Sequence, residues 1–383
     1  MSRYDCAVAI PPIDLRAQAR ALGTALQDAI AEVVEDQQCI LGPHVERFER
    51  AMAEYCGTGH AVGVASGTDA LLLALAALGV GPGTFVVTTA FTFFATGSTI
   101  ARLGARPIFA DIDPATCNLD PRSVEAAIAR APGRVAGIVP VHLYGRLADM
   151  TGLAEIAARH ECWLLEDAAQ AVGARRNGRA AGTFGRAGCF SFYPTKNLGA
   201  LGDAGMIVTD DAALAAHLRR ERHQGQVDRY HHESLGHCAR LDAVQAAVLR
   251  AKLPHLDRWN ARRRAIAARY DAGLRAAEMA GHTGAPIVLP PAAGTDHVWH
   301  QYVVRAERRD ALQAHLATAG IGAMVYYPVP LHRQPPLAAS LTPVPLDESE
   351  RAAREVLALP IYPELADEQI DTVVAAVRAF YPR

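Results

Sequence analysis

The feature that most constrains the fold is an alternation of short apolar runs with helical patterns through the first two thirds of the 383 residues. Apolar runs of this length, bounded by turn residues, predict buried strands. They cover residues 61–65, 85–89, 107–110, 137–141, 162–165, 189–193 and 206–209. Helices are predicted between several of them, at residues 69–78, 121–129 and 150–159. This alternation favours an α/β fold, a mostly parallel sheet with helices on both faces.

The last third of the chain predicts a second, smaller domain. From Asp242 the pattern is strongly helical, and Pro254 is expected to kink or divide that helix because proline lacks an N–H. We therefore place a large domain at residues 1–254 and a smaller C-terminal α/β domain at residues 255–383. Candidate strands of the smaller domain lie at residues 298–304 and 323–327. The basic run at residues 262–264 is interpreted as a solvated helix face, with a phosphate contact as the alternative.

Composition and charge exclude several classes of protein. Half of the residues are hydrophobic, a fifth are charged, and the net charge is −2, which indicates a globular protein without a nucleic-acid or membrane surface. The seven cysteines are scattered without a CxxC pair, so a disulfide framework or zinc site is not expected and a cytoplasmic location is favoured. The N-terminal segment is too polar and proline-interrupted for a signal peptide. No apolar run reaches the roughly 18 residues that a membrane span needs.

A candidate anion site lies at the turn Ser66-Gly67-Thr68, between a predicted strand and a predicted helix. A helix N-terminus offers unpaired N–H groups and the positive end of the helix dipole, which together bind phosphate. Gly67 lets the backbone approach an anion closely. The alternative is an ordinary helix cap formed by the serine.

Two further clusters follow predicted strands. Asp167 follows the strand predicted at residues 162–165, where ligands bind in parallel sheets. A buried carboxylate there needs a partner such as a protonated ring nitrogen; a helix cap is the alternative. Lys196 follows an apolar strand and a proline, so burial in a cleft is expected to lower its pKa and make it a nucleophile for carbonyls. Ser191 in that strand could donate to a phosphate. The GxxxxGK[ST] order is absent, which argues against nucleotide hydrolysis.

An anion cradle, a buried carboxylate and a nucleophilic lysine are the three groups that pyridoxal 5'-phosphate requires. The phosphate needs N–H and hydroxyl donors, the pyridine nitrogen needs a carboxylate, and the aldehyde needs a lysine. An aromatic ring against the pyridine face would complete the site. Phe93 is the candidate, with an ordinary core position as the alternative.

Eight motifs spread over nearly the whole chain are informative together: ILGPHVERFE (40–49), SGTDAL (66–71), FTFFAT (91–96), DIDP (111–114), PVHLYG (140–145), EDAAQ (166–170), SFYPTKNLG (191–199) and RLDAVQAA (240–247). In these motifs the sequence resembles the sugar aminotransferases of the DegT/DnrJ/EryC1/StrS family, which are fold type I pyridoxal-phosphate enzymes. The resemblance implies that Lys196 bonds to the cofactor aldehyde and later shuttles a proton. It implies that Asp167 pairs with the pyridinium nitrogen and that Gln170 hydrogen-bonds the phenolic oxygen of the ring.

The resemblance also implies a phosphate site and a substrate contact. Gly67, Thr68 and Ser191 would hold the cofactor phosphate, and Phe93 would stack on the ring. His332, in the motif YPVPLH, would lie near the substrate. A homodimer with active sites at its interface is expected.

The implied reaction moves an amino group from an amino acid, L-glutamate in this family, to a keto sugar carried on a nucleotide, a 3-keto or 4-keto deoxysugar. Lysine at position 196 points to transamination, because family members that dehydrate sugars carry histidine there. One alternative is another pyridoxal-phosphate reaction, either a dehydration or aromatisation or a reaction on a non-sugar ketone. A non-catalytic binding or regulatory protein is the other.

Two positions depart from the family pattern. The chain reads Gly-His-Cys-Ala-Arg at residues 236–240, where the family has Gly-Tyr-Asn-x-Arg and its asparagine reaches the neighbouring subunit's cofactor phosphate. Cys238 is a much weaker donor, so cofactor affinity or the shape of the substrate entrance is expected to differ. Ala204 replaces a glycine, which would add strain if that position required a positive φ.

Overall fold

The computed structural model describes residues 9–381, and the predicted sheet is its centre. The seven strands lie in the order β1-β9-β8-β5-β4-β2-β3. They are β1 (His60–Val64), β2 (Phe85–Thr89), β3 (Arg106–Ala110), β4 (Val135–Val139), β5 (Trp163–Asp167), β8 (Ala187–Ser191) and β9 (Gly205–Thr209). Strand β9 is antiparallel to its neighbours β1 and β8, and all other neighbouring pairs are parallel. All seven strand predictions are confirmed, with ends that differ by at most two residues. Residues 1–8, which belong to the N-terminal segment considered for a signal peptide, lie outside the described part.

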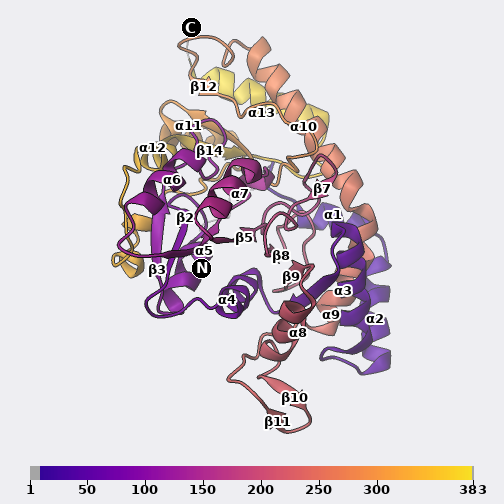
Figure 1. The fold of residues 1–383 in the computed structure, drawn as a ribbon. Coiled ribbons are helices and arrows are strands. Elements are labelled where there is room, and N and C mark those ends of the chain that lie inside the picture. The colour runs from indigo at the N-terminus through magenta and orange to yellow at the C-terminus, as the bar shows by residue number, and fades with distance from the viewer. Residues whose placement is uncertain (1–8, 382–383) are drawn as a thin grey trace.

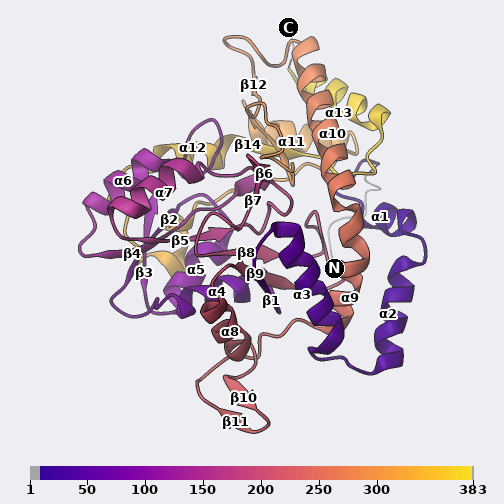
Figure 2. The same ribbon diagram turned by 45° about the vertical axis from the view of Figure 1, so that its right-hand side comes forward.

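Helices cover both faces of this sheet (Figures 1 and 2). One face carries α4 (Gly67–Ala77), α5 (Phe94–Arg102) and α8 (Ala212–Glu221), and the other carries α3 (Gly42–Cys56), α6 (Pro121–Ala129) and α7 (Met150–Arg159). Side chains of a strand alternate between the faces. Val86 packs into the core under α4 and α5, whereas its neighbour Val87 packs against α6 and α7.

A second sheet lies beyond the first and is built from the C-terminal third of the chain (Figure 1). Its strands β12 (Ile287–Val288), β13 (Tyr302–Ala306) and β14 (Val356–Leu359) are antiparallel. They share one core with α10 (Leu256–Ala276), α11 (Arg309–Thr318) and α13 (Asp367–Phe380). Helix α12 (Asp347–Glu355) leads into β14.

The strand predictions were less accurate here. The strand expected at residues 298–304 begins only at Tyr302, and the one expected at 323–327 is wrong. In that segment Met324 forms an isolated bridge with Ala358 beside β14, and the chain then leaves the sheet. Two prolines, Pro328 and Pro330, follow within a few residues and cannot donate to a ladder.

Pro254 divides the long helical segment as predicted. Helix α9 (Ala243–Lys252) ends before a 3-10 turn at Leu253–His255, and α10 continues beyond it. The later chain returns to the first sheet, where Leu341 bridges Ile108 at the outer edge of β3. The domain boundary at residue 254 stays a prediction.

The remaining elements lie at the periphery. Helices α1 (Leu15–Ala21) and α2 (Ala25–Asp36) precede α3, and α2 packs on α9. A short hairpin, β6 (Arg175–Arg176) and β7 (Arg179–Ala180), precedes β8. A second hairpin, β10 (Gln226–Asp228) and β11 (His231–His232), projects away from the body of the molecule (Figures 1 and 2). Within residues 9–381 no helix is both long and apolar enough to cross a membrane.

The basic run on α10 is not a uniformly solvated face, which corrects that prediction for Arg263. This side chain is 2% exposed and donates to the carbonyl oxygens of Trp299, His300 and Ile361. Burial lowers the pKa of Arg263 to about 10. One guanidinium therefore joins α10 to the segments that enter β13 and leave β14.

We expect Arg263→Leu to lower the free energy of unfolding by about 3 kcal/mol, because buried carbonyl oxygens lose a charged donor. Arg264→Leu, at the partly exposed next position, is the matched control and is expected to change it by less than about 0.5 kcal/mol. Denaturant unfolding followed by circular dichroism measures both. Equal effects of the two substitutions would show that Arg263 does not fasten α10.

Candidate active site

One cavity of about 640 Å³ opens where the codirectional strands β1, β2, β5 and β8 end. Because parallel strands end at the same edge of a sheet, their following loops meet there. Seven of the eight predicted site residues line this cavity: Gly67, Thr68, Phe93, Asp167, Gln170, Ser191 and Lys196. The eighth, His332, does not.

The first turn of α4 forms the candidate anion cradle. Ser66 caps the helix, since its Oγ accepts from the Asp69 N–H at 3.0 Å and donates to the Asp69 carboxylate at 2.8 Å. The cap and the ligand site therefore coexist, because the N–H groups of Gly67 and Thr68 have no hydrogen-bond acceptor among the described residues. A Cβ at Gly67 would lie 2.6 Å from the Cβ of Ser191, so glycine is what lets that hydroxyl come next to the helix N-terminus.

Asp167 provides a buried carboxylate at the end of β5. Thr96 Oγ1 donates to its Oδ2 at 2.8 Å and the N–H of Ala169 donates to its Oδ1 at 3.2 Å. No described cationic side chain lies within ion-pairing distance, and burial is the main cause that raises the pKa of this carboxyl. The residues after it form turns rather than a helix, so the helix-cap alternative is wrong. A cationic N–H group in the cavity would relieve the cost of this charge.

Lys196 is one of only two lysines in the chain. The other, Lys252, is buried away from the cavity and donates to the Gly199 carbonyl at 2.7 Å and to Gln18 Oε1 at 3.2 Å. Lys196 is partly exposed onto the cavity, and its Nζ has no hydrogen-bond partner among residues 9–381. Burial lowers the pKa of Lys196 to about 8, against the opposing charge of Asp167. The geometry thus leaves Lys196 as the one lysine that can reach a carbonyl in the cavity.

Gln170 has a fixed orientation. Its Oε1 accepts from the backbone N–H of Tyr144 at 2.6 Å, so its Nε2 faces the cavity and donates to the Tyr327 hydroxyl at 3.1 Å. The second N–H of that amide can donate to a ligand oxygen. Phe93 is 56% exposed, with its ring 6.1 Å from that of Tyr327, so an ordinary core position is the wrong interpretation of Phe93.

Several side chains of the cavity were not predicted. Thr96 bonds Asp167, and Tyr326, Tyr327 and His300 line the wall. Tyr326 and Tyr327 belong to the segment 323–327, for which the sequence analysis predicts a strand, and they directly precede the prolines of the YPVPLH motif. His332 lies in the 3-10 turn Leu331–Arg333, and its Nε2 is 3.1 Å from Glu350 Oε1, so its substrate role stays a prediction.

The two departures from the family pattern have different consequences. Ala204 is buried and its φ is not positive, so alanine adds no backbone strain at this position. Cys238 is exposed, and its sulfur accepts a hydrogen bond from Arg240 Nη2 at 3.1 Å.

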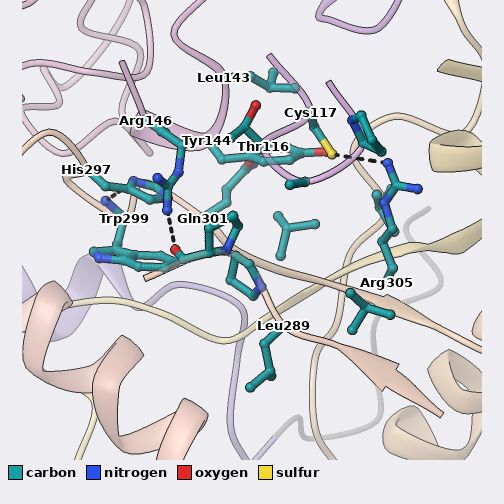
Figure 3. A pocket seen from close by; sticks show the side chains of 17 residues that line it. Thr116, Cys117, Leu143, Tyr144, Arg146, Leu289, His297, Trp299, Gln301 and Arg305 are labelled. Atoms are coloured by element: carbon teal, nitrogen blue, oxygen red, sulfur yellow. Dashed lines mark hydrogen bonds between the residues drawn. The ribbon is translucent and has the colours of Figure 1, made fainter. Parts of the chain in front are cut away.

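A smaller cavity of about 30 Å³ lies behind Tyr144 and contains none of the predicted site residues (Figure 3). Arg146, His297 and Trp299 close one side, and Cys117 with Arg305 closes another. Its volume suits about one water molecule. The Tyr144 hydroxyl donates to the Tyr326 carbonyl while the Tyr144 N–H bonds Gln170, so this packed region supports the wall of the larger cavity.

The cradle, the carboxylate and the lysine together fit pyridoxal 5'-phosphate, and with the sheet order they define a fold type I aminotransferase. The chain belongs to the DegT/DnrJ/EryC1/StrS aminotransferase family, whose model matches residues 21–378. That family depends on pyridoxal phosphate, which is the cofactor of this protein.

Similar proteins span the whole chain. A transaminase of Streptomyces venezuelae, named for dTDP-3-amino-3,4,6-trideoxy-α-D-glucose, is 46% identical over 98% of this chain and 97% of its own. A "pleiotropic regulatory protein" of Geobacillus stearothermophilus is 48% identical over 97% and 98%. Among solved structures, S. venezuelae DesV has a TM-score of 0.91 at 46% identity, covering 97% and 98%. NtdA of Bacillus subtilis, solved with bound cofactor PMP, has a TM-score of 0.88 at 29% identity, covering 99% and 87%.

Thr96→Val should weaken retention of pyridoxal phosphate roughly tenfold, because Asp167 loses a donor that stabilises its charged form. Thr99→Val is the matched control: Thr99 lies on the same helix, is equally buried, and donates only to backbone carbonyls. The dissociation constant can be followed by quenching of protein fluorescence on cofactor binding. Indistinguishable constants for the two variants would contradict this role of Thr96.

The lowered pKa of Lys196 predicts a pH dependence. Only the neutral amine attacks an aldehyde, so the rate at which the cofactor-free protein captures pyridoxal phosphate should rise through about pH 8 and level off above it. An ordinary lysine, with a pKa of 10.5, would still be mostly protonated there. Stopped-flow absorbance over a pH series measures the midpoint, and Lys252→Arg should leave it unchanged. A midpoint above pH 10 would contradict desolvation of Lys196.

Proposed function

We propose that this aminotransferase moves an amino group from L-glutamate to carbon 3 of a nucleotide-linked keto-deoxysugar. The observation that carries the proposal is the exposure of a single lysine, Lys196, on a cavity that also holds the under-paired carboxylate of Asp167. Names of relatives guide the choice of substrate. Besides the S. venezuelae transaminase, a 43% identical protein of Acidithiobacillus ferrooxidans is named a UDP-N-acetyl-3-dehydro-α-D-glucosamine 3-aminotransferase.

Bound pyridoxal phosphate supplies an electron sink for the substrate carbon. Lys196 would attach the cofactor in the resting enzyme and, once free, would carry a proton from the substrate carbon to carbon 4′ of the cofactor. Asp167 keeps a proton on the ring nitrogen, and Gln170 donates its free N–H to the ring oxygen. In this proposal Gly67, Thr68 and Ser191 bind the phosphate, and the exposed ring of Phe93 covers the pyridine face.

Alternative functions have weaker support. The solved structure of 3-amino-5-hydroxybenzoic acid synthase is also similar, at 30% identity, so the fold serves more than one reaction. Lysine rather than histidine at position 196 favours amino transfer over dehydration. One relative is named as a regulator, yet this chain carries the lysine, the carboxylate at 167 and the amide at 170 in one cavity, which favours an enzyme.

We further propose that the protein is a cytoplasmic homodimer with its active sites at the interface. Exposed apolar side chains support a covered surface near the cavity, where Phe93 and Tyr193 are 56% and 53% exposed. On and beside the projecting hairpin, Tyr230 and Leu235 are 78% and 99% exposed. Monomeric proteins rarely expose large contiguous patches of apolar side chains.

Incubation with L-glutamate should produce one equivalent of 2-oxoglutarate per active site, and a dTDP- or UDP-linked 3-keto sugar should then accept the amino group. The matching 4-keto sugar is the comparison substrate, and Lys196→Ala is the inactive control. Chromatography with mass spectrometry identifies both products. If 2-oxoglutarate forms but only the 4-keto sugar is turned over, the choice of carbon 3 is overturned. If no 2-oxoglutarate forms, the proposed amino donor is overturned.

A further inference from the structure

His300 lies on the wall of the cavity that holds Lys196, immediately before the segment that enters β13. It is 9% exposed. Its Nδ1 is 3.1 Å from Oδ1 of Asn197, the residue that follows the lysine. His300 is thus within hydrogen-bonding distance of the side chain of the residue that directly follows Lys196 in the chain.

The hydrogen-bond network fixes which ring nitrogen of His300 carries the proton. Asn197 Nδ2 donates to the Val298 carbonyl at 3.0 Å and to Asn260 Oδ1 at 2.8 Å. A carbonyl oxygen only accepts, so the amide nitrogen of Asn197 must face it and its oxygen must face the histidine. Asn260 is fixed in the same way, because its Nδ2 donates to the Val172 carbonyl. His300 Nδ1 must therefore be the N–H, and Nε2 carries a lone pair.

The ring is held neutral by its surroundings. Burial is the main cause that lowers the pKa of His300 well below its ordinary value, and the charges of Lys196, Arg263 and His297 act in the same direction. Arg263 also donates to the backbone carbonyl of His300. Among residues 9–381 no donor is bonded to Nε2, and Lys196 lines the same cavity as the ring of His300.

We propose that His300 is a positioning residue whose Nε2 accepts a hydrogen bond from the amine of Lys196 during amino transfer. A neutral amine has two N–H groups and one lone pair. When an acceptor holds one N–H, the lone pair stays free to take a proton from the substrate carbon. The other tautomer of His300 would donate to that lone pair and block the base. The inference rests on the proposed role of Lys196, and it assigns Asn197 the task of selecting the histidine tautomer.

Two substitutions of His300 separate this role from packing. Asn places an amide N–H near the former Nδ1, toward Asn197, but offers no acceptor at the former Nε2. Gln is longer and can place its amide oxygen there. In single-turnover reaction of the holoenzyme with L-glutamate, we expect His300→Asn to slow the amino-transfer step roughly 10- to 100-fold, with glutamate affinity little changed. His300→Gln should recover most of the rate. Equal losses in both variants, or no loss in either, would overturn the proposal.

A second readout does not depend on activity. In the full chain labelled with ring-15N histidine, and with the signals of His300 assigned by their loss in His300→Gln, we expect a protonated Nδ1 and a bare Nε2. A proton on Nε2 would overturn the proposal.

The role of Lys196 is tested separately. Lys196→Ala that still transaminates would refute the proposed function of the lysine. An inactive Lys196→Ala together with equal losses in the two His300 variants would refute only the role of the histidine.

Discussion

The buried charge of Asp167 is the constraint on which the site depends. Its neighbour on β5, Glu166, points to the other side of the strand, and the N–H groups of Gly182, Phe184 and Gly185 and the ring of His142 satisfy it. Asp167 has only the Thr96 hydroxyl and one backbone N–H. A fully bonded carboxylate stabilises the fold, whereas an under-bonded one at a cavity wall is available to a ligand. Alternation along one strand thus separates a fully bonded acid from one that a ligand in the cavity can reach.

The use of lysine supports the same interpretation. Lys and Arg together number 38, and only two of these are lysines. Arginine serves where a buried cation must stay charged, as in the bond of Arg222 to Glu49 and in the carbonyl contacts of Arg263. Lysine loses its charge more readily on burial, which suits a nucleophile. Lys252 is the exception, and it holds the carbonyl of Gly199 in the glycine-rich loop that follows Lys196.

Much of the fold and of the site could be predicted because both depend on where the buried strands end. The apolar runs predicted the strands, and the ligand groups stand directly after strands, so the sequence indicated which loops carry the site. Contacts between distant segments left no local signal. Arg263 is basic on a helix, and only the folded chain brings it to three carbonyl groups. Thr96, Tyr327 and the tautomer of His300 depend likewise on tertiary packing, and residues 323–327 have strand-like composition without a strand to pair with along their length.

The attachment of the cofactor to Lys196 is tested most directly by reducing the holoenzyme with sodium borohydride, digesting it, and locating the attached pyridoxyl group by mass spectrometry. Because the chain has two lysines, the outcome distinguishes them clearly. We expect the label on the peptide that contains Lys196, in stoichiometric amount. A label on Lys252, or no covalent label on a protein that has bound the cofactor, would contradict it.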